Sequence, residues 1–322
     1  MKPLPKSSFR CPDCRQAALR FSEDRVVCDS CASVFPVVNG NPVLLAHDNP
    51  FFPVVAAARP PETSWIRRVR RLVPRPGVNL SRTPSLRLLV EEAARRNGAF
   101  VLVVGSAEQK NELADLFAAY PTVTPVYSDV DPDAHVDLYC DAQELPFVDG
   151  TFSAAIITGV LNSTPYPEQA VAELQRALAE GGLVYSEAPF VQHVAFGAHD
   201  FHRFTLAGHR HLFRRFREIS SGMVAGPATV LYWAVESLVL TLLPARGRLV
   251  GKGLLRTCLS WIKYLDYLLR RRPAAVDGAS NTYFLGRLES GYEADYYSVV
   301  SRYEGDPRIA VAVADGGDPS RR

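Results

Sequence analysis

Four cysteines near the start of the chain have the spacing of a metal site. Cys11 and Cys14 form CPDC, Cys28 and Cys31 form CDSC, and thirteen residues separate the two pairs. Two such pairs suit a tetrahedral ion held by two tight turns, and four thiolates leave no open position for a substrate. We therefore expect one structural zinc ion. Disulfides or redox pairs are the alternatives. The sequence shows no secretory signal at its start, and the reducing cytoplasm that we expect as its location disfavours disulfides.

A second group of polar residues follows short apolar runs in the middle of the chain. These runs alternate with helical patterns and predict a parallel, doubly wound α/β sheet. The expected strands are 99–104, 123–127, 136–139, 152–158 and 183–186, and the expected helices are 86–94, 108–119 and 167–178. Ligands of such a sheet bind beyond the carboxyl ends of its strands. The residues that we expect there are Gly105, Ser106, Asp129, Asp131, Asp141, Ala142, Leu145 and Asn162.

The chemistry of these residues suits an adenosyl cofactor. A glycine turn at Gly105 lets the backbone approach the ligand. A carboxylate at the end of the second strand, Asp129 or Asp131, can accept from both ribose hydroxyls. Asp141 at the third strand can accept from the adenine amino group, with Leu145 or Phe147 against the ring.

Residues 141–161, DAQELPFVDGTFSAAIITGVL, and 165–190 resemble the class I S-adenosylmethionine-dependent methyltransferases, in particular the methyltransferase type 11 group. The resemblance covers about residues 99–216. It implies a Rossmann-like methyltransferase sheet, an S-adenosylmethionine cofactor and methylation of a small-molecule or glycolipid-type acceptor. The first motif departs from the family, because Val103, Ala107 and Gln109 replace an acidic residue and two glycines. The alternative is a non-catalytic scaffold that docks a partner through the zinc module.

Residues 9–45 resemble the zinc-ribbon protein that activates tRNA and translation-factor methyltransferases. Asn39-Gly40 in FPVVNGNPVLL predicts a tight hairpin turn within this module. The resemblance raises RNA as a rival substrate. A net charge of +2 and the absence of an aromatic-basic RNA motif count against nucleic acid.

The loop after the fifth strand, residues 189–205, carries the acid–base candidates. His199 beside Asp200 has the pattern of a base with an orienting carboxylate, and His202 is a second candidate. Alternatively, Asp200, Arg203 and Thr205 tie the loop to the following helix, with Thr205 as its N-cap.

The C-terminal part departs from a minimal sheet domain. Residues 227–243 are apolar on nearly all sides, and residues 253–272 have apolar side chains at helical spacing. We favour a lid over the acceptor pocket or plain packing, and peripheral contact with a membrane surface is the alternative. Residues 282–288 predict a late strand, and no oligomeric state is indicated. We expect five parts in the chain: a zinc ribbon (1–47), a linker (48–83), the methyltransferase core (84–222), a helical insertion with the late strand (223–304) and a loose tail (305–322). The linker is expected to contain one short helix near residues 65–72.

Overall fold

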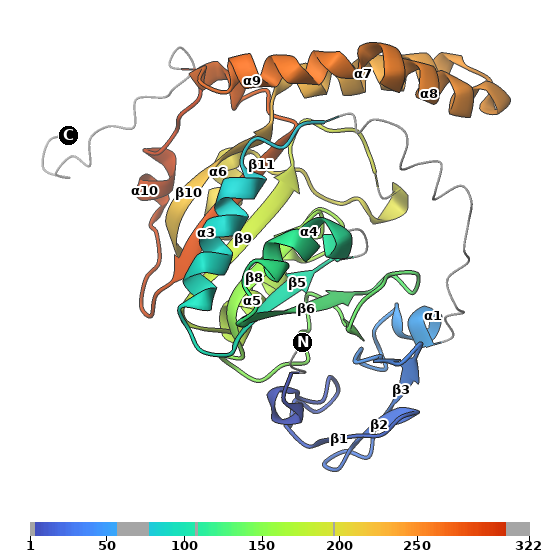
Figure 1. Ribbon diagram of the computed structural model, residues 1–322, viewed down its shortest axis with the longest axis vertical. Helices are drawn as coiled ribbons and strands as arrows, with labels where there is room; N and C mark the ends of the chain where they lie inside the picture. Colours follow the sequence, from blue (N-terminus) through green and yellow to red (C-terminus); the bar gives the residue numbers. More distant parts are fainter. Residues whose placement is uncertain (1–3, 57–76, 107–108, 196, 307–322) are drawn as a thin grey trace, which may run out of the picture.

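The protein contains two β-sheets, which Figure 1 shows in a computed structural model that describes residues 4–56, 77–106, 109–195 and 197–306. A small sheet has the order β1-β2-β3-β4, and a seven-stranded sheet has the order β10-β11-β9-β8-β5-β6-β7. The strands are β1 (Leu19–Phe21), β2 (Arg25–Cys28), β3 (Val34–Val38), β4 (Asn41–Pro42), β5 (Ala99–Val104), β6 (Val123–Asp129), β7 (Leu138–Tyr139), β8 (Phe152–Thr158), β9 (Leu178–Pro189), β10 (Phe216–Ala225) and β11 (Asn281–Leu288).

The large sheet is parallel except at one side. Strands β5, β6, β7, β8 and β9 pair in parallel, whereas β11 pairs antiparallel with both β9 and β10. The doubly wound sheet and the late strand are therefore confirmed. The sequence patterns did not predict β10. Its side chains are mostly half-buried, which leaves neither a continuous apolar run nor a clean alternation.

Helices cover both faces of the large sheet. The α-helices of the described residues are α1 (Phe52–Ala56), α3 (Arg82–Ala94), α4 (Gln109–Ala118), α5 (Pro167–Ala177), α6 (Leu206–Leu212), α7 (Pro227–Leu242), α8 (Arg248–Leu259), α9 (Leu265–Leu269) and α10 (Tyr296–Val300), of which α1 packs against the small sheet. Val101 and Val103 of β5 pack in one core cluster with α3 and α4, whereas Leu102 and Val104 pack in another with α5. Alternate side chains of a strand point to opposite faces, so β5 supplies both cores.

The small cysteine-rich sheet is joined to the edge of the large one. Val43 forms a parallel bridge with Tyr139 of β7, and the Leu44 amide donates to the Tyr139 carbonyl at 2.8 Å. Phe9 forms a second bridge with Phe147, and both lie in the core cluster that includes Cys11. The small module therefore shares its hydrophobic core with the large domain.

The segment expected to be a linker from residue 48 is ordered at its start. It begins with a buried Asn49 and continues into α1, in which Val55 is buried. The short helix expected near residues 65–72 and the end of the tail lie outside the described residues. The Asn39-Gly40 turn is confirmed, since both residues have positive φ and Val38 pairs with Asn41.

Helices α7, α8 and α9 are inserted between β10 and β11 and pack against one another, with the 3₁₀ helix η4 (Ser260–Tyr264) between α8 and α9. Figure 1 shows them as a bar across one end of the molecule, opposite the cysteine-rich module. Within the described residues, no helix has both the length and the apolar character needed to cross a membrane.

Candidate functional site

The four cysteines expected to bind zinc converge at one point. Their Sγ atoms lie within 4.8 Å of one another, with 3.7 Å between Cys11 and Cys31 and 3.6 Å between Cys14 and Cys28. A tetrahedral zinc–thiolate site with bonds of about 2.3 Å requires sulfur atoms roughly 3.8 Å apart. A disulfide would need about 2.0 Å. The cluster thus has the geometry of a structural zinc site, not of two disulfides.

Two equivalent turns hold these thiols. The amides of Arg15 and Ala32 donate to the carbonyls of Cys11 and Cys28, each at 2.9 Å. Arg15 and Ala32 have φ of 64° and 62°, although neither is glycine. Matching strained turns after each pair are what a two-knuckle site requires, since each turn must aim two sulfur atoms at one ion.

The turn after β5 lies where the sequence predicts the cofactor edge. Gly105 has φ of 71°, and a Cβ atom there would clash with Cγ2 of Val160 from the loop after β8. The Gly105 amide donates to the Ser128 carbonyl of β6 at 2.9 Å, and Ser106 is fully buried. Glycine is therefore required at this position by both its dihedral angle and its neighbour. Ala107 lies outside the described residues.

Two buried acceptors flank this turn. Gln109 begins α4 and donates from Nε2 to the Gly105 carbonyl at 2.9 Å, while its Oε1 atom has no hydrogen-bond partner among the described residues. Oδ1 of Asn162, after β8, also lacks a partner there, and Asn162 is only 2% exposed. A buried polar atom without a partner costs about 1–3 kcal/mol, so two such acceptors at one sheet edge fit a ligand that donates hydrogen bonds.

The acids at the second strand have different positions. Asp129 is the last residue of β6, and its Oδ1 accepts from the amides of Val130 and Asp131 at 2.8 and 3.0 Å. Asp131 lies in the following turn, where its Oδ1 accepts from the Asp133 amide at 2.9 Å. Of the two, Asp129 lies at the carboxyl end of the strand itself.

Asp141, Ala142 and Leu145 are buried in the segment after β7. Oδ2 of Asp141 accepts from Nδ2 of Asn49 at 2.9 Å, and Oδ1 accepts from the Gln143 amide at 2.8 Å. Sequence reasoning missed Asn49. It lies ninety-two positions before Asp141, in a segment expected to be a linker, and no local pattern marks it.

The loop after β9 is fastened to the loop after β8. The Asp200 carboxylate pairs with Arg203 through contacts of 2.6 and 2.8 Å and accepts from Nδ2 of Asn162 at 3.0 Å. The Asn162 carbonyl accepts from the amides of Phe201 and His202. Thr205 caps α6 by accepting from the Gly208 amide at 3.0 Å. Thr205 thus has the capping position that the loop-tying alternative expects, whereas the contacts of Asp200 and Arg203 lie within the loop and to Asn162.

The loop histidines have separate surroundings. The His199 ring lies 5.9 Å from that of Phe51, between centroids, and His202 Nε2 lies 3.2 Å from the Pro165 carbonyl. His193 faces Trp233 of α7, edge to face, at 4.6 Å between centroids. Burial lowers the pKa of His193, so its imidazole is mainly neutral near pH 7.

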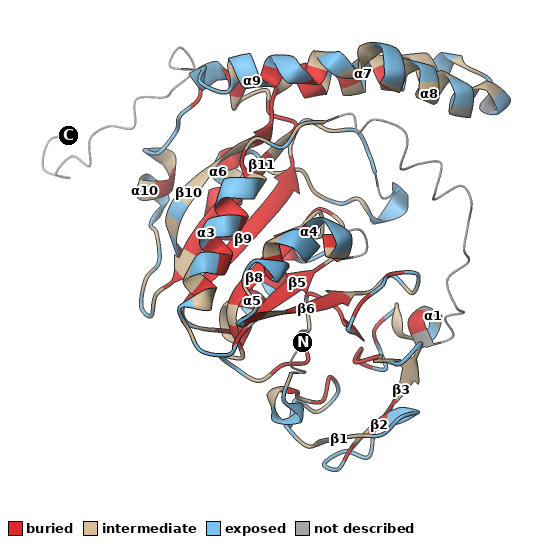
Figure 2. Cartoon of the chain, in the orientation of Figure 1, coloured by how far each residue is buried: buried red, intermediate tan, exposed pale blue. Residues whose placement is uncertain are grey.

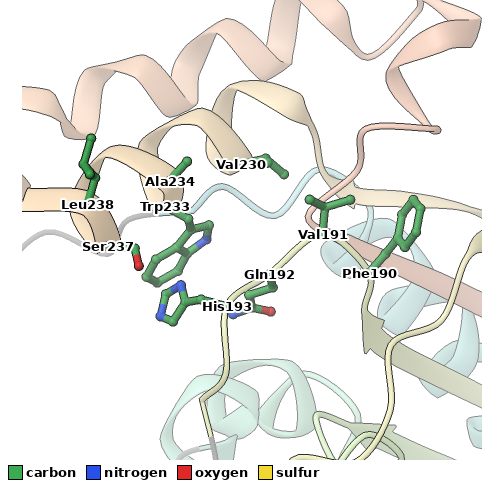
Figure 3. A pocket seen from close by; sticks show the side chains of 9 residues that line it. All are labelled: Phe190, Val191, Gln192, His193, Val230, Trp233, Ala234, Ser237 and Leu238. Atoms are coloured by element: carbon green, nitrogen blue, oxygen red, sulfur yellow. The ribbon is translucent and has the colours of Figure 1, made fainter. Parts of the chain in front are cut away.

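A pocket of about 560 Å³ lies between this loop and α7. Figure 3 shows His193 and Trp233 facing each other at its wall, with apolar side chains beside them. Its lining residues are Phe190, Val191, Gln192, His193, Val230, Trp233, Ala234, Ser237 and Leu238. Since Phe190 directly follows β9, the pocket opens at the carboxyl end of that strand, with α7 above it.

In a comparison with known proteins, residues 129–186 match the family described as a methyltransferase domain. No curated protein matches the chain. Among solved structures, the StiE O-MT fragment is 16% identical, with a TM-score of 0.43, 76% of this chain covered and 89% of that one. A chain from the complex containing the Haloferax volcanii Trm112 methyltransferase activator is 16% identical, with a TM-score of 0.40 and coverages of 62% and 89%.

A further similar structure is phosphoethanolamine N-methyltransferase 2 of Haemonchus contortus in complex with S-adenosyl-L-methionine. It is 13% identical, with a TM-score of 0.43, 66% of this chain covered and 54% of that one. The family match spans the segment from the end of β6 to β9, the same stretch in which the sequence resembles the type 11 group. The chain thus combines a seven-stranded α/β sheet, part of which matches a methyltransferase domain, with an N-terminal four-cysteine module of the zinc-ribbon type.

Proposed function

We propose that the protein transfers a methyl group from S-adenosylmethionine to a small-molecule acceptor. The observation that carries this proposal is a pair of buried acceptors at the carboxyl edge of the sheet, Gln109 Oε1 and Asn162 Oδ1, to which no described residue donates a hydrogen bond. An ammonium group such as that of the methionine part of the cofactor donates the hydrogen bonds that these atoms lack. The methyltransferase family match includes Asn162 and supports the same assignment.

The other proposed contacts follow from position along this edge. Asp129 would accept from the ribose hydroxyls, and Asp141 with Ala142 and Leu145 would hold the adenine. Gly105 and Ser106 would let the backbone approach the ligand. Asp131 is the second candidate for the ribose. Bound there, S-adenosylmethionine supplies an electrophilic methyl group on a sulfonium.

The pocket beneath α7 is the acceptor site that we propose, with α7 as its lid. Its apolar and aromatic walls suit an acceptor with an apolar part, and His193 offers a neutral imidazole in that wall. His193 therefore joins His199 and His202 as a candidate to take a proton from a hydroxyl acceptor. We propose that Asp200 acts by positioning the loop, since Arg203 and Asn162 hold its carboxylate.

The alternative function is a scaffold without catalysis. The observation that favours it is that polar groups at the cofactor edge already form hydrogen bonds within the protein. Gln109 donates to the Gly105 carbonyl, and Asn49 donates to the Asp141 carboxylate. In that case the four-cysteine module would dock a partner.

Thermal unfolding with S-adenosylhomocysteine separates the two functions. A ligand that binds only the folded state stabilises it by about 2.7 kcal/mol at one hundred times its dissociation constant. We expect this shift in the wild type and its loss in Gly105→Ala, because the added Cβ meets Val160. Gly98→Ala is the matched control, since Gly98 has φ of 68° but open space around its missing side chain. Absence of any shift in the wild type would favour the scaffold.

A further inference from the structure

The bar formed by α7, α8, η4 and α9 leaves a broad apolar surface in solvent. Its large exposed apolar residues lie 54–77% exposed and include Leu231, Leu238, Leu242, Leu254, Trp261 and Leu268. Leu231, Leu238 and Leu242 fall on one stripe of α7, because their spacing of seven and four residues returns to the same side of a helix. Figure 2 shows exposed residues along the length of this bar. Exposed apolar surface of this extent marks an interaction site.

The same segment carries a net positive charge. Residues 227–272 contain eight Lys or Arg and two acidic residues, an excess of six positive charges, whereas the whole chain has a net charge of +2. The remainder of the chain is therefore net negative, and the positive charge is concentrated on the bar. The exposed cations are Arg246, Arg248, Arg270, Arg271 and Arg272.

Both acidic residues of the bar are buried and used internally. Asp266, fully buried, accepts from the amides of Gly226, Ala228 and Thr229 at the start of α7 and so fixes α9 to α7. Glu236, 3% exposed, pairs with Arg256 at 3.2 Å and ties α8 to α7. These contacts hold the helices of the bar together, and every exposed charged residue of the segment is a cation, beside the exposed apolar side chains that form its outer surface.

We infer that this outer surface binds an anionic lipid bilayer, with the bar lying flat in the interface. Leucine and tryptophan side chains enter the boundary between headgroups and acyl chains, while arginines pair with lipid phosphates. Trp261, Tyr264 and Tyr267 are exposed aromatics of the kind that anchor proteins at this depth. A second copy of the chain fits less well, because a symmetric contact would bring two sets of arginines together.

The location of the surface connects it with two pockets. Leu238 is 63% exposed and also lines the pocket below α7. Arg270, Arg271 and Arg272 line another pocket, of about 410 Å³, at the other end of the bar. A bilayer against the bar would therefore meet the mouth of the first pocket, and lipid phosphates would meet the arginines of the second.

Vesicle co-sedimentation of the full chain tests this inference without any methyl donor. We expect binding to vesicles of equal parts phosphatidylcholine and phosphatidylglycerol, weak binding to phosphatidylcholine alone, and release when salt reduces the Debye length from about 10 Å to about 3 Å. Replacing Arg270, Arg271 and Arg272 together by Gln should lower the partition coefficient roughly 100-fold. Leu254→Ser with Leu268→Ser should lower it at least about tenfold.

Tyr297→Ser is the matched control, because Tyr297 is 63% exposed on α10, outside the bar, and its loss should leave binding unchanged. An unchanged melting temperature shows that each variant is folded. The salt titration uses only the wild-type protein, so it tests the inference even if a variant does not fold. Equal binding to both vesicle types, or binding insensitive to the leucine changes, would overturn the inference. So would a wild-type dimer that the leucine variant dissociates, or RNA binding in place of vesicle binding. A failure here leaves the S-adenosylhomocysteine shift untouched, so the two proposals fail separately.

Discussion

The side-chain amide of Asn49 donates a 2.9 Å hydrogen bond to the carboxylate of Asp141, which links the segment after the four-cysteine module to the candidate adenine site. Both residues are buried. Asn49→Ala leaves the Asp141 oxygen short of a donor, and we expect the free energy of unfolding to fall by about 1–3 kcal/mol. Urea denaturation of both proteins at pH 7 measures the difference.

Asn49→Asp is the matched variant for this contact. It replaces the donor by a carboxylate that faces Asp141, and two close carboxylates raise the pKa of the pair. The loss of stability should therefore be largest at neutral pH and become smaller as the pH falls and the pair takes up a proton. A variant as stable as the wild type at pH 7 would show that the contact does not hold the segment in place.

Removal of the metal should affect the whole chain. Cys11 and Cys28 share a core cluster with Leu145 and Phe147 of the large domain, so loss of the ion exposes a common core. We expect one zinc per purified chain by elemental analysis. Cys11→Ser with Cys14→Ser should remove it and lower the melting temperature. Cys258→Ser should keep the metal, because Cys258 is exposed and remote in sequence from the cluster. A metal-free wild type with four ordinary thiols would contradict the assignment.

Much of the fold was accessible from the sequence because its signals are local. Periodicity at residues 86–94 and the apolar run at 99–104 predict α3 and β5 closely. Strand β10 was not predicted, because its half-buried residues follow no period. The structure at the start of the expected linker was not predicted either, because it depends on contacts between distant residues, such as that of Asn49 with Asp141. Periodicity shows that α7 has apolar sides, but only the packed structure shows which of them the protein covers.

The candidate site was accessible for a topological reason. Carboxyl ends of parallel strands meet at one edge, so Gly105, Asp129 and Asn162 could be grouped before their positions were known. The residues that these three contact could not be predicted in this way. Val160 lies against Gly105, and Asn162 donates a hydrogen bond to Asp200. Both contacts join different loops, and no spacing along the chain predicts them.

The ribose assignment predicts unequal effects of two neighbouring acids. Asp129 ends β6, and two backbone amides orient its carboxylate. Asp129→Ala should weaken S-adenosylhomocysteine binding by roughly 2–4 kcal/mol, because hydrogen bonds to a charged group are lost. Asp131→Ala and the control Asp133→Ala should change the dissociation constant only a few-fold. Calorimetry gives all three values. Unchanged affinity in Asp129→Ala would remove it from the cofactor site, and a large effect of Asp131→Ala alone would transfer the role.

Acid should destabilise the protein through His209. Its fully buried ring lies between Ser186 of β9 and Thr282 of β11, with nitrogen–oxygen distances of 2.9 and 3.0 Å. Burial lowers the pKa of His209 from 6.5 to about 3. Between these values the unfolded chain binds a proton that the folded chain does not, so stability falls as the pH falls, by up to about 1.4 kcal/mol per pH unit.

This loss should begin below pH 6.5 and continue toward pH 3. His209→Gln removes the titrating group and keeps an amide that can bond either hydroxyl. Urea denaturation between pH 7 and pH 4.5 should then give a dependence of the unfolding free energy that is shallower than that of the wild type by about one proton. His211→Gln, on the exposed side of the same helix, is the control and should keep the wild-type slope. Parallel curves for His209→Gln and the wild type would mean that the folded protein protonates this ring as readily as the unfolded chain does. A shallower curve would identify the buried imidazole between β9 and β11 as a main source of acid sensitivity in the sheet.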